Sequence, residues 1–433
     1  MIICTNRMEY PLRNQRAHTQ AMNSEKDRVS LLLTKALVSR GGLDAVSQQM
    51  ALHPQYLESF LRTQHYILHM DGPLPLPYRH YIAIMAAAQH HCHDLVYLHS
   101  AQFLRVGGDP LWLQGLEAAP PRLRLLDHIN KVLAHQPWLT ACSHIQALLK
   151  SGEQCWSLAE LVQAVVLLAH CHSLCSFVFG CDTDLVALSK SPNGTPPAFC
   201  PFDAANGNTS VPQSLTTPNE HVKQRQSVDS SGDVLFLKER IHKPQDECEK
   251  RDERFLQTDV EEEEEAVVCW CADLSRFITD PDFCYQEFAR REDDQFQVFR
   301  VQDYSWEDHG FSLVNRLYSD IGHLLDDRFR SVTSLPSLLS PDLKRAVWNY
   351  IHCVLGIRYD DYDYGEVNHL LERDLKLYIK TVACFPDATK TPACPLSPIK
   401  ASERIQVILL IMEARLQAEL LYALRAITQY MIA

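Results

Sequence analysis

Residues 157–177 read SLAELVQAVVLLAHCHSLCSF, an almost unbroken apolar stretch. Ser157 and Glu160 have the spacing of a capping box, in which a serine hydroxyl and a glutamate carboxylate bind free N–H groups at a helix start. A buried strand can also be rich in valine and leucine, but strands rarely exceed about ten residues. The cap and the length therefore predict a buried helix.

Helical spacing extends outward from this stretch in both directions. Apolar residues recur at three- and four-residue intervals from Asp27 to about residue 180, as in Tyr56-Leu57-Phe60-Leu61, and proline and glycine mark the breaks. The same periodicity resumes after Trp270, in residues 311–329, 343–355, 367–382 and 405–431. No alternating run is long enough to demand a sheet, so we predict an all-α fold.

Composition divides the chain into four segments. At 433 residues with 46% hydrophobic residues, the chain is long enough for two folded domains. Residues 188–266 are instead rich in Ser, Thr, Pro and charge, and include the run Glu261–Glu265, which is typical of a solvated linker. We predict a poorly ordered N-terminus (1–24), an N-terminal helical domain (25–187), an acidic disordered linker (188–266) and a C-terminal helical domain (267–433).

Charge and cysteine content exclude several classes of protein. The formal charge of −13 disfavours binding to nucleic acid, which needs a cationic face. Fifteen cysteines, an odd number at irregular spacings, suggest reduced thiols in the cytosol or nucleus. The first 23 residues lack an apolar stretch of signal-peptide length, and four charged residues interrupt the apolar residues 407–433. We expect neither secretion nor membrane insertion.

The densest reactive cluster is His90-His91-Cys92-His93-Asp94, followed by His99. Neighbouring helical residues point about 100° apart, so these histidines cannot converge on one ion, and we predict no metal site or other cofactor. Cys92 could be a nucleophile activated by nearby histidines, or a partly buried cysteine beside surface histidines. His99 lies on the same helical face but about 10 Å along the axis, beyond direct hydrogen-bond reach.

A second unusual segment, residues 356–366, reads GIRYDDYDYGE. It resembles part of a calcium-binding loop, but the liganding spacing and the distal glutamate are absent. Three tyrosines interleaved with three aspartates are typical of an exposed recognition loop, in which tyrosine supplies contact area and aspartate supplies charge. The alternative is a turn whose tyrosines pack into the domain.

Several long runs resemble the sestrin family across both predicted domains: residues 78–88 (YRHYIAIMAAA), 178–180 (VFG), 348–353 (WNYIHC), 356–367 and 422–428 (YALRAIT). Sestrins are stress-induced regulators that restrain the TOR growth kinase complex by binding the GATOR complex, and some are leucine sensors that the amino acid releases. The resemblance implies two helical halves of alkylhydroperoxidase-like fold, of which the N-terminal half is credited with hydroperoxide reduction.

The resemblance also assigns roles to individual residues. It implies that Cys92 is a peroxide-reactive thiol with His99 in its proton relay, although a family tyrosine is Asp94 here, and a carboxylate there disfavours a thiolate. The GATOR-binding aspartates of the family correspond to Asp360 and Asp361. Supporting partner contacts correspond to His53 and Ser157, and Ser157 is also a helix cap.

The residues that bind leucine in the family are only partly present in this chain. Glu403 matches the family residue that binds the leucine ammonium, and Ser340 lies near a family threonine. The arginine that binds the carboxylate aligns with Lys344, which keeps the charge but loses the planar bidentate fork. A family histidine is Gln406, and the pocket tryptophan is absent from residues 386–400. We predict weak or absent binding of L-leucine.

Two functional hypotheses follow. The chain is either an interaction protein that inhibits TOR signalling through the GATOR complex, or a cysteine-dependent alkyl hydroperoxide reductase. The first predicts that residues Asp360 and Asp361 are needed for binding, and the second predicts that Cys92 is needed for peroxide turnover.

Overall fold

The computed structural model describes residues 31, 45–150, 152, 155–181, 273–288, 298–336, 339–386 and 400–433. The predicted N-terminal segment 1–24 and the predicted linker 188–266 lie outside these residues. Residues 386–400, from which the family's pocket tryptophan is absent, also lie outside the described residues, except for the two end residues.

The N-terminal half is helical throughout its described residues, and the predicted capping box at Ser157 begins its longest helix. Its helices are α2 (Ala45–Met50), α3 (Pro54–His69), α4 (Leu76–Gln89), α5 (His93–Arg105), α6 (Pro121–His135), α7 (Cys142–Leu149) and α8 (Leu158–Gly180). Short 3₁₀ turns connect them at Pro110–Gln114, Leu116–Ala118 and Pro137–Leu139.

The C-terminal half adds a 3₁₀ turn (Leu274–Phe277), a π-helical turn (Trp306–Gly310) and helices α12 (Phe311–Leu317), α13 (Ile321–Ser334), α14 (Pro341–Val354), α15 (Gly365–Leu370), α16 (Arg373–Cys384) and α17 (Ala401–Ile432). The two strands of the described residues, β1 (Phe299–Arg300) and β2 (Ile357–Arg358), pair in parallel, with Phe299 opposite Ile357. The all-α prediction is confirmed. Two stretches predicted as single helices, 311–329 and 367–382, are each divided by a turn.

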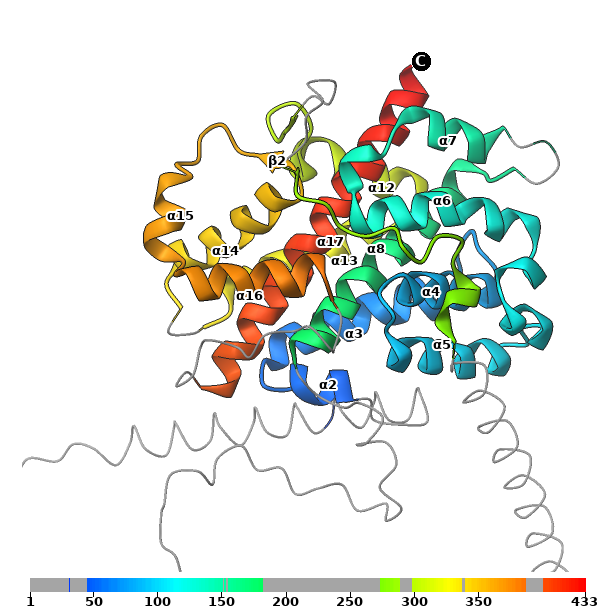
Figure 1. The fold of residues 1–433 in the computed structure, drawn as a ribbon, viewed down its shortest axis with the longest axis horizontal. Coiled ribbons are helices and arrows are strands. Elements are labelled where there is room, and N and C mark those ends of the chain that lie inside the picture. The colour runs from blue at the N-terminus through cyan, green and yellow to red at the C-terminus, as the bar shows by residue number, and fades with distance from the viewer. Residues whose placement is uncertain are drawn as a thin grey trace, which may run out of the picture. The chain divides into compact units, whose positions relative to one another are not determined.

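The two halves share one core. All described residues fall in a single compact unit, and α17 runs through its middle beside α8 (Figure 1). Both helices are buried on nearly every side, because they are apolar almost all round and need protein cover everywhere. Helix α8 is long and apolar enough to cross a membrane, but its apolar stretch is entirely buried in the protein.

Three of the four charges that interrupt α17, those of Glu413, Arg415 and Glu419, are paired in this core. Arg328 of α13 binds Glu413 through two N–H groups, and the hydroxyl of Tyr56 from α3 also donates to Glu413. Arg415 Nε lies 2.7 Å from Glu419 Oε1, and both side chains are about 1% exposed. Paired in this way, the charged groups of α17 are compatible with its burial.

Candidate functional site

The tyrosine–aspartate loop, residues 359–364, directly follows strand β2, which lies shortly after the end of helix α14. The backbone turns at Gly356, whose φ of +82° lies in the left-handed region. A Cβ there would come within 2.7 Å of the Phe288 ring and 2.9 Å of the Tyr422 hydroxyl. Both conformation and space therefore require glycine at the entrance to the loop.

Strand pairing fixes the first residues of the loop. Arg358 of β2 lies opposite Arg300 of β1, and the Val301 N–H donates to the Arg358 carbonyl at 3.0 Å. The same pairing brings Arg300 within 3.7 Å of the Asp360 carboxylate, with both side chains about half exposed. An ion pair this exposed contributes little stability, so it does not commit Asp360 to a structural role.

The tyrosines of the loop form its inner layer. The Tyr359 hydroxyl lies 3.1 Å from His352 Nδ1, and the Tyr359 N–H donates to the Tyr364 hydroxyl at 2.9 Å. Burial raises the pKa of Tyr359. The rings of Tyr362 and Tyr364 pack edge to face, with centroids 5.1 Å apart. The loop therefore has features of both the expected exposed loop and the alternative packed turn. Its tyrosines pack inward, and its aspartates are exposed.

The three aspartates have different surroundings. Asp363 accepts a hydrogen bond from the Gly365 N–H at 2.7 Å and so caps the start of α15. Asp361 is exposed and, among the described residues, has no hydrogen-bond or ion-pair partner. Local structure therefore accounts for Asp363, whereas Asp360 and Asp361 remain available to a binding partner.

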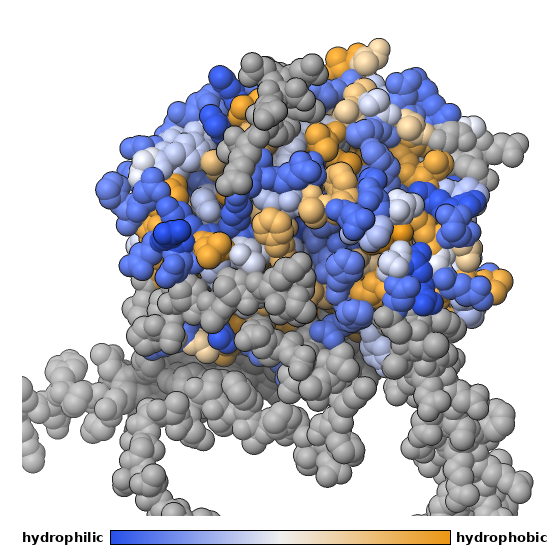
Figure 2. Space-filling model, in the orientation of Figure 1, coloured by the Kyte–Doolittle hydropathy of each residue, from blue (hydrophilic) through white to orange (hydrophobic). Residues whose placement is uncertain are grey.

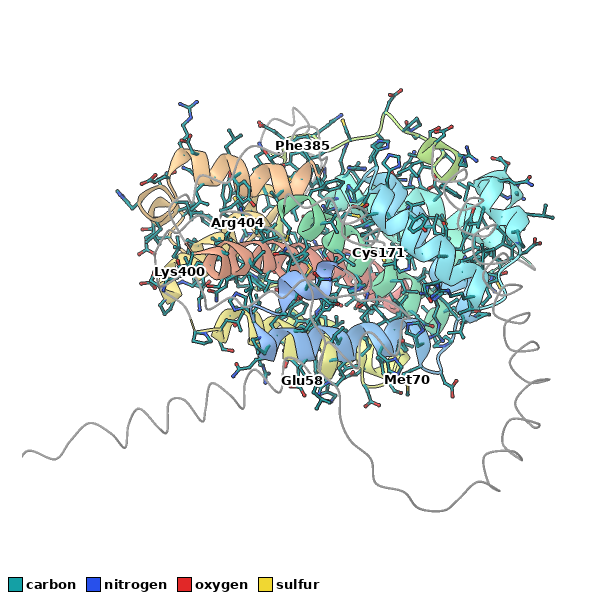
Figure 3. All side chains as sticks on the ribbon, turned by 90° about the horizontal axis from the view of Figure 1, so that it is seen from below. Glu58, Met70, Cys171, Phe385, Lys400 and Arg404 are labelled. Carbon is teal, nitrogen blue, oxygen red and sulfur yellow. The ribbon has the colours of Figure 1, made fainter. Side chains whose placement is uncertain are left out.

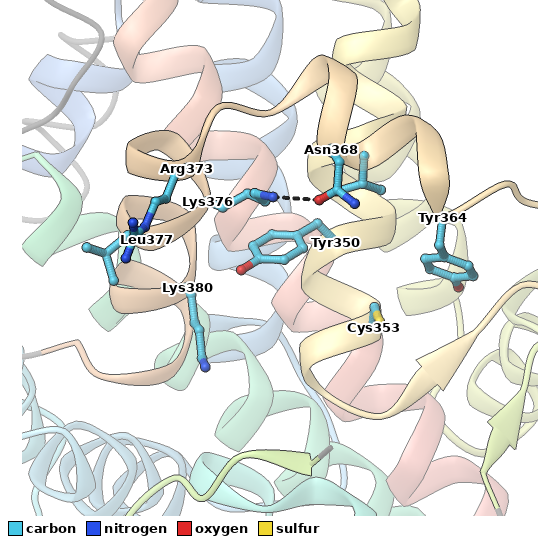
Figure 4. Close-up of a pocket in the computed structure, with 9 residues that line it drawn as sticks. Tyr350, Cys353, Tyr364, Asn368, Arg373, Lys376, Leu377 and Lys380 are labelled. Atoms are coloured by element: carbon cyan, nitrogen blue, oxygen red, sulfur yellow. Dashed lines mark hydrogen bonds between the residues drawn. The ribbon is translucent and has the colours of Figure 1, made fainter. Parts of the chain in front are cut away.

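A cavity of about 460 Å³ lies beside the loop, between α14, α15 and α16 (Figure 4). Its lining includes three cations of α16 and no carboxylate: Tyr350, Cys353, Tyr364, Val367, Asn368, Arg373, Lys376, Leu377 and Lys380. Lys376 donates to Asn368 at 2.7 Å, and Lys380 pairs with Glu287 at 2.6 Å. In a chain of net charge −13 this cationic lining is unusual. The spacing of 373, 376 and 380 on one helical face could have predicted it.

The face of the molecule shown in Figure 2 mixes hydrophilic residues with small hydrophobic patches. Such a surface offers a partner polar contacts as readily as apolar ones. Recognition on this face would depend on particular charged groups rather than on one large apolar patch.

His53 and Ser157 lie far from each other. His53 is 7% exposed, and its Nε2 lies 2.7 Å from the Ser402 carbonyl at the start of α17. Ser157 begins α8, which runs antiparallel to α17, since Gly180 neighbours Ile408 and His172 binds Glu419. The two residues therefore lie toward opposite ends of α17, a helix about 48 Å long at 1.5 Å per residue. Together with the loop, they do not form one compact patch.

Ser157 has a complete structural role. Its hydroxyl accepts the Glu160 N–H at 3.2 Å, the Glu160 carboxylate accepts the Ser157 N–H at 2.8 Å, and Arg122 pairs with Glu160 at 2.8 Å. Burial, the largest single influence, raises the pKa of Glu160, but the hydrogen bonds with Ser157 and Arg122 and the Arg122 charge together outweigh it and lower the pKa.

We expect Ser157→Ala to lower the free energy of unfolding by about 1 kcal/mol, because the N-cap bond is lost. Urea denaturation of Ser157→Ala and Ser157→Asp measures this, since aspartate keeps the cap. Equal destabilisation by both substitutions would contradict a capping role. A partner-binding defect in the stable Ser157→Asp variant alone would reveal a separate role at the interface.

Lys344, one of the predicted leucine-binding residues, lies beside the end of α13 and is already bonded within the protein. Lys344 Nζ donates to the carbonyls of Thr333 at 3.2 Å and Leu335 at 2.6 Å. Gln406 Nε2 donates to the same Leu335 carbonyl at 3.3 Å. These bonds leave Lys344 at most one of its three N–H groups for a carboxylate.

Ser340, a second residue of the predicted leucine site, is also bonded within the protein. The Ser340 hydroxyl accepts the Leu343 N–H at 3.1 Å and caps α14, while Glu403 lies buried in the first turn of α17. Arg345, next to Lys344, packs over the Tyr362 ring at 5.5 Å and thus faces the tyrosine–aspartate loop. It does not replace the missing fork in the leucine site.

Cys92 and His99 occupy different surroundings. His99 Nδ1 lies 3.3 Å from His80 Nδ1, and burial lowers the pKa of His80 to about 2. Cys92, the N-cap of α5, is 1% exposed and neighbours two thiols of α8, Cys171 and Cys175. The structure thus places His99 with a histidine and Cys92 with thiols. Sequence reasoning missed this thiol cluster because its members come from separate helices.

Comparison with known proteins covers almost the whole chain. The family model described as PA26 p53-induced protein (sestrin) matches residues 13–431. Sestrin-3 of Mus musculus is 49% identical over 445 residues, which cover 94% of this chain and 89% of that protein. Sestrin-1 of Macaca fascicularis is 48% identical over 95% and 88% of the two chains. Sestrin-2 of Homo sapiens is 48% identical over 92% and 86%.

Proposed function

Because the chain belongs to the sestrin family, we propose that it restrains TOR complex signalling under stress by binding the GATOR complex in the cytosol or nucleus. In this proposal leucine regulates the binding weakly or not at all. The supporting observation is the tyrosine–aspartate loop, in which a packed tyrosine layer presents Asp360 and Asp361 to solvent.

The loop is suited to charge-dependent recognition. Its backbone is held at both ends, by β2 pairing before Asp360 and by the Asp363 cap after it. The loop therefore loses little conformational entropy when a partner binds the two carboxylates. Their charges would meet a cationic group on the partner, and charge complementarity of this kind determines specificity and association rate.

Weak leucine regulation follows from the bonds of Lys344. A leucine carboxylate would have to compete with two main-chain carbonyls for the Lys344 ammonium, and lysine gives no bidentate fork. We expect isothermal titration calorimetry of the full chain to show no binding at micromolar leucine, with a parallel glycine titration as the control. Micromolar leucine affinity would contradict this expectation.

Hydroperoxide reduction is the second candidate function, and the thiol cluster around Cys92 is the observation in its favour. The role of His99 in a proton relay stays a prediction, and the His99 ring contacts that of His80. If Cys92 reacts with peroxide, Cys92→Ser removes peroxide consumption by the purified chain. Unchanged consumption in Cys92→Ser would exclude Cys92 as the reactive thiol.

A further inference from the structure

Three thiols from two parts of the N-terminal half meet in the core. Cys92 follows the end of α4, which packs on α8, and its N–H donates to the Ala87 carbonyl at 3.0 Å. Cys171 and Cys175 are one turn apart on α8 and are 1% and 0% exposed. Figure 3 shows Cys171 in the interior, whereas Glu58 and Met70 of the α3 region point outward. Cys175 forms a side-chain hydrogen bond with Cys92, and Cys171 is an electrostatic neighbour of Cys92.

Cys92 lies directly beneath the surface. Both sequence neighbours, His91 and His93, are exposed, and His91 has a φ of +52° that turns the chain between α4 and α5. A small oxidant would need only a local opening of this turn to reach Cys92, and openings of this size cost less than global unfolding. Cys175 is fully buried in the C-terminal third of α8.

We propose that Cys175 is the resolving thiol for Cys92, so that a hydroperoxide converts the two thiols to a disulfide. The Cys92 sulfur attacks the terminal peroxide oxygen, the O–O bond breaks, and Cys92 sulfenic acid and an alcohol form. The Cys175 sulfur then attacks the Cys92 sulfur, the S–O bond breaks, and water leaves with the Cys175 proton. In total, one hydroperoxide is reduced and two thiols are oxidised. This inference rests on the second candidate function.

The choice of Cys175 over Cys171 depends on contact. Of the two α8 thiols, Cys175 is the one with a side-chain hydrogen bond to Cys92, and disulfide formation requires sulfurs that can approach to about 2.05 Å without backbone movement. Burial raises the pKa of both α8 thiols. This rise does not distinguish the two thiols. As the Cys175 sulfur attacks, its proton passes to the departing hydroxide, which leaves as water.

Peptide mapping of the full chain tests the inference. The purified protein is treated with tert-butyl hydroperoxide, denatured, alkylated, digested and analysed by mass spectrometry. We expect a Cys92–Cys175 cross-linked peptide that disappears after reduction with dithiothreitol. In Cys175→Ala the cross-link is lost and Cys92 sulfinic acid accumulates, whereas the matched variant Cys171→Ala keeps the cross-link. The wild-type map is decisive even if a variant folds poorly.

Three other results would overturn the inference in distinguishable ways. Cys92 sulfinic acid with a freely alkylated Cys175 in the wild-type chain would show peroxide reactivity without a resolving thiol. A Cys92–Cys171 cross-link would show that Cys171, and not Cys175, is the resolving thiol. Fully alkylated, unoxidised Cys92 would contradict hydroperoxide reduction itself, together with the inference that rests on it.

Discussion

Replacing both Asp360 and Asp361 with alanine should abolish co-purification of the chain with the GATOR complex. Truncating one side of a charged contact at an interface costs about 2–5 kcal/mol, which weakens binding by about thirtyfold or more. The double variant should fold normally, because neither carboxylate is buried and the one ion pair that they make with the described residues, between Asp360 and Arg300, is exposed. Affinity capture of the GATOR complex with wild-type and variant chains measures the loss.

A charge-matched control is available for this experiment. Asp71 and Asp282 are also exposed and lie outside the loop, so Asp71→Ala with Asp282→Ala removes the same net charge. This control should bind like wild type. Equal capture by the loop variant and wild type would exclude the two aspartates as partner contacts. Equal weakening by the control would indicate an effect of overall charge.

The largest expected effect on stability is that of Arg415→Met. Arg415 is buried and joins α17 to four other parts of the fold: it donates to Ser176, Ala383 and Ala134 and to the ring nitrogen of His90, and it pairs with Glu419. Burial and the positive Arg415 lower the pKa of His90, so its neutral ring accepts the bond. We expect a loss of about 3–5 kcal/mol in the free energy of unfolding, because Glu419 and two carbonyls lose a buried partner.

Urea denaturation monitored by circular dichroism measures this loss. Arg316→Met is the matched control, since Arg316 is exposed on α12 and contacts Met431; it should change stability by less than about 0.5 kcal/mol. Comparable small changes in both variants would contradict a structural role for the buried network around Arg415.

Local sequence signals predicted where the helices lie, but not the turns that divide two of the predicted stretches into separate helices. The capping box at Ser157 and the length of residues 157–177 gave α8 with its observed start. The apolar spacing of 311–329 and 367–382 continued across two short turns, so each stretch looked like one helix. At the first turn, Asn315 accepts the Gly322 N–H at 2.7 Å and Asp320 adopts a φ of +65°. The hydrogen bond and the backbone conformation form only when the chain folds, so they do not interrupt the apolar periodicity of the sequence.

Contacts between distant residues could not be predicted. Composition suggested that each half has its own core, yet α8 and α17 pack together because each is too apolar to be covered within its own half. The pairing of Cys92 with Cys175, and of His53 with Ser402, depends on how helices from different parts of the chain meet. The residue types of the loop were visible in the sequence, but the separation of capping Asp363 from available Asp360 and Asp361 required the structure.

Capture of the GATOR complex by the full chain, with and without added leucine, tests the proposed function most directly. We predict equal capture in both conditions, because the loop is intact while Lys344 is occupied by main-chain carbonyls. Release of the complex by micromolar leucine, or no capture in either condition, would contradict it.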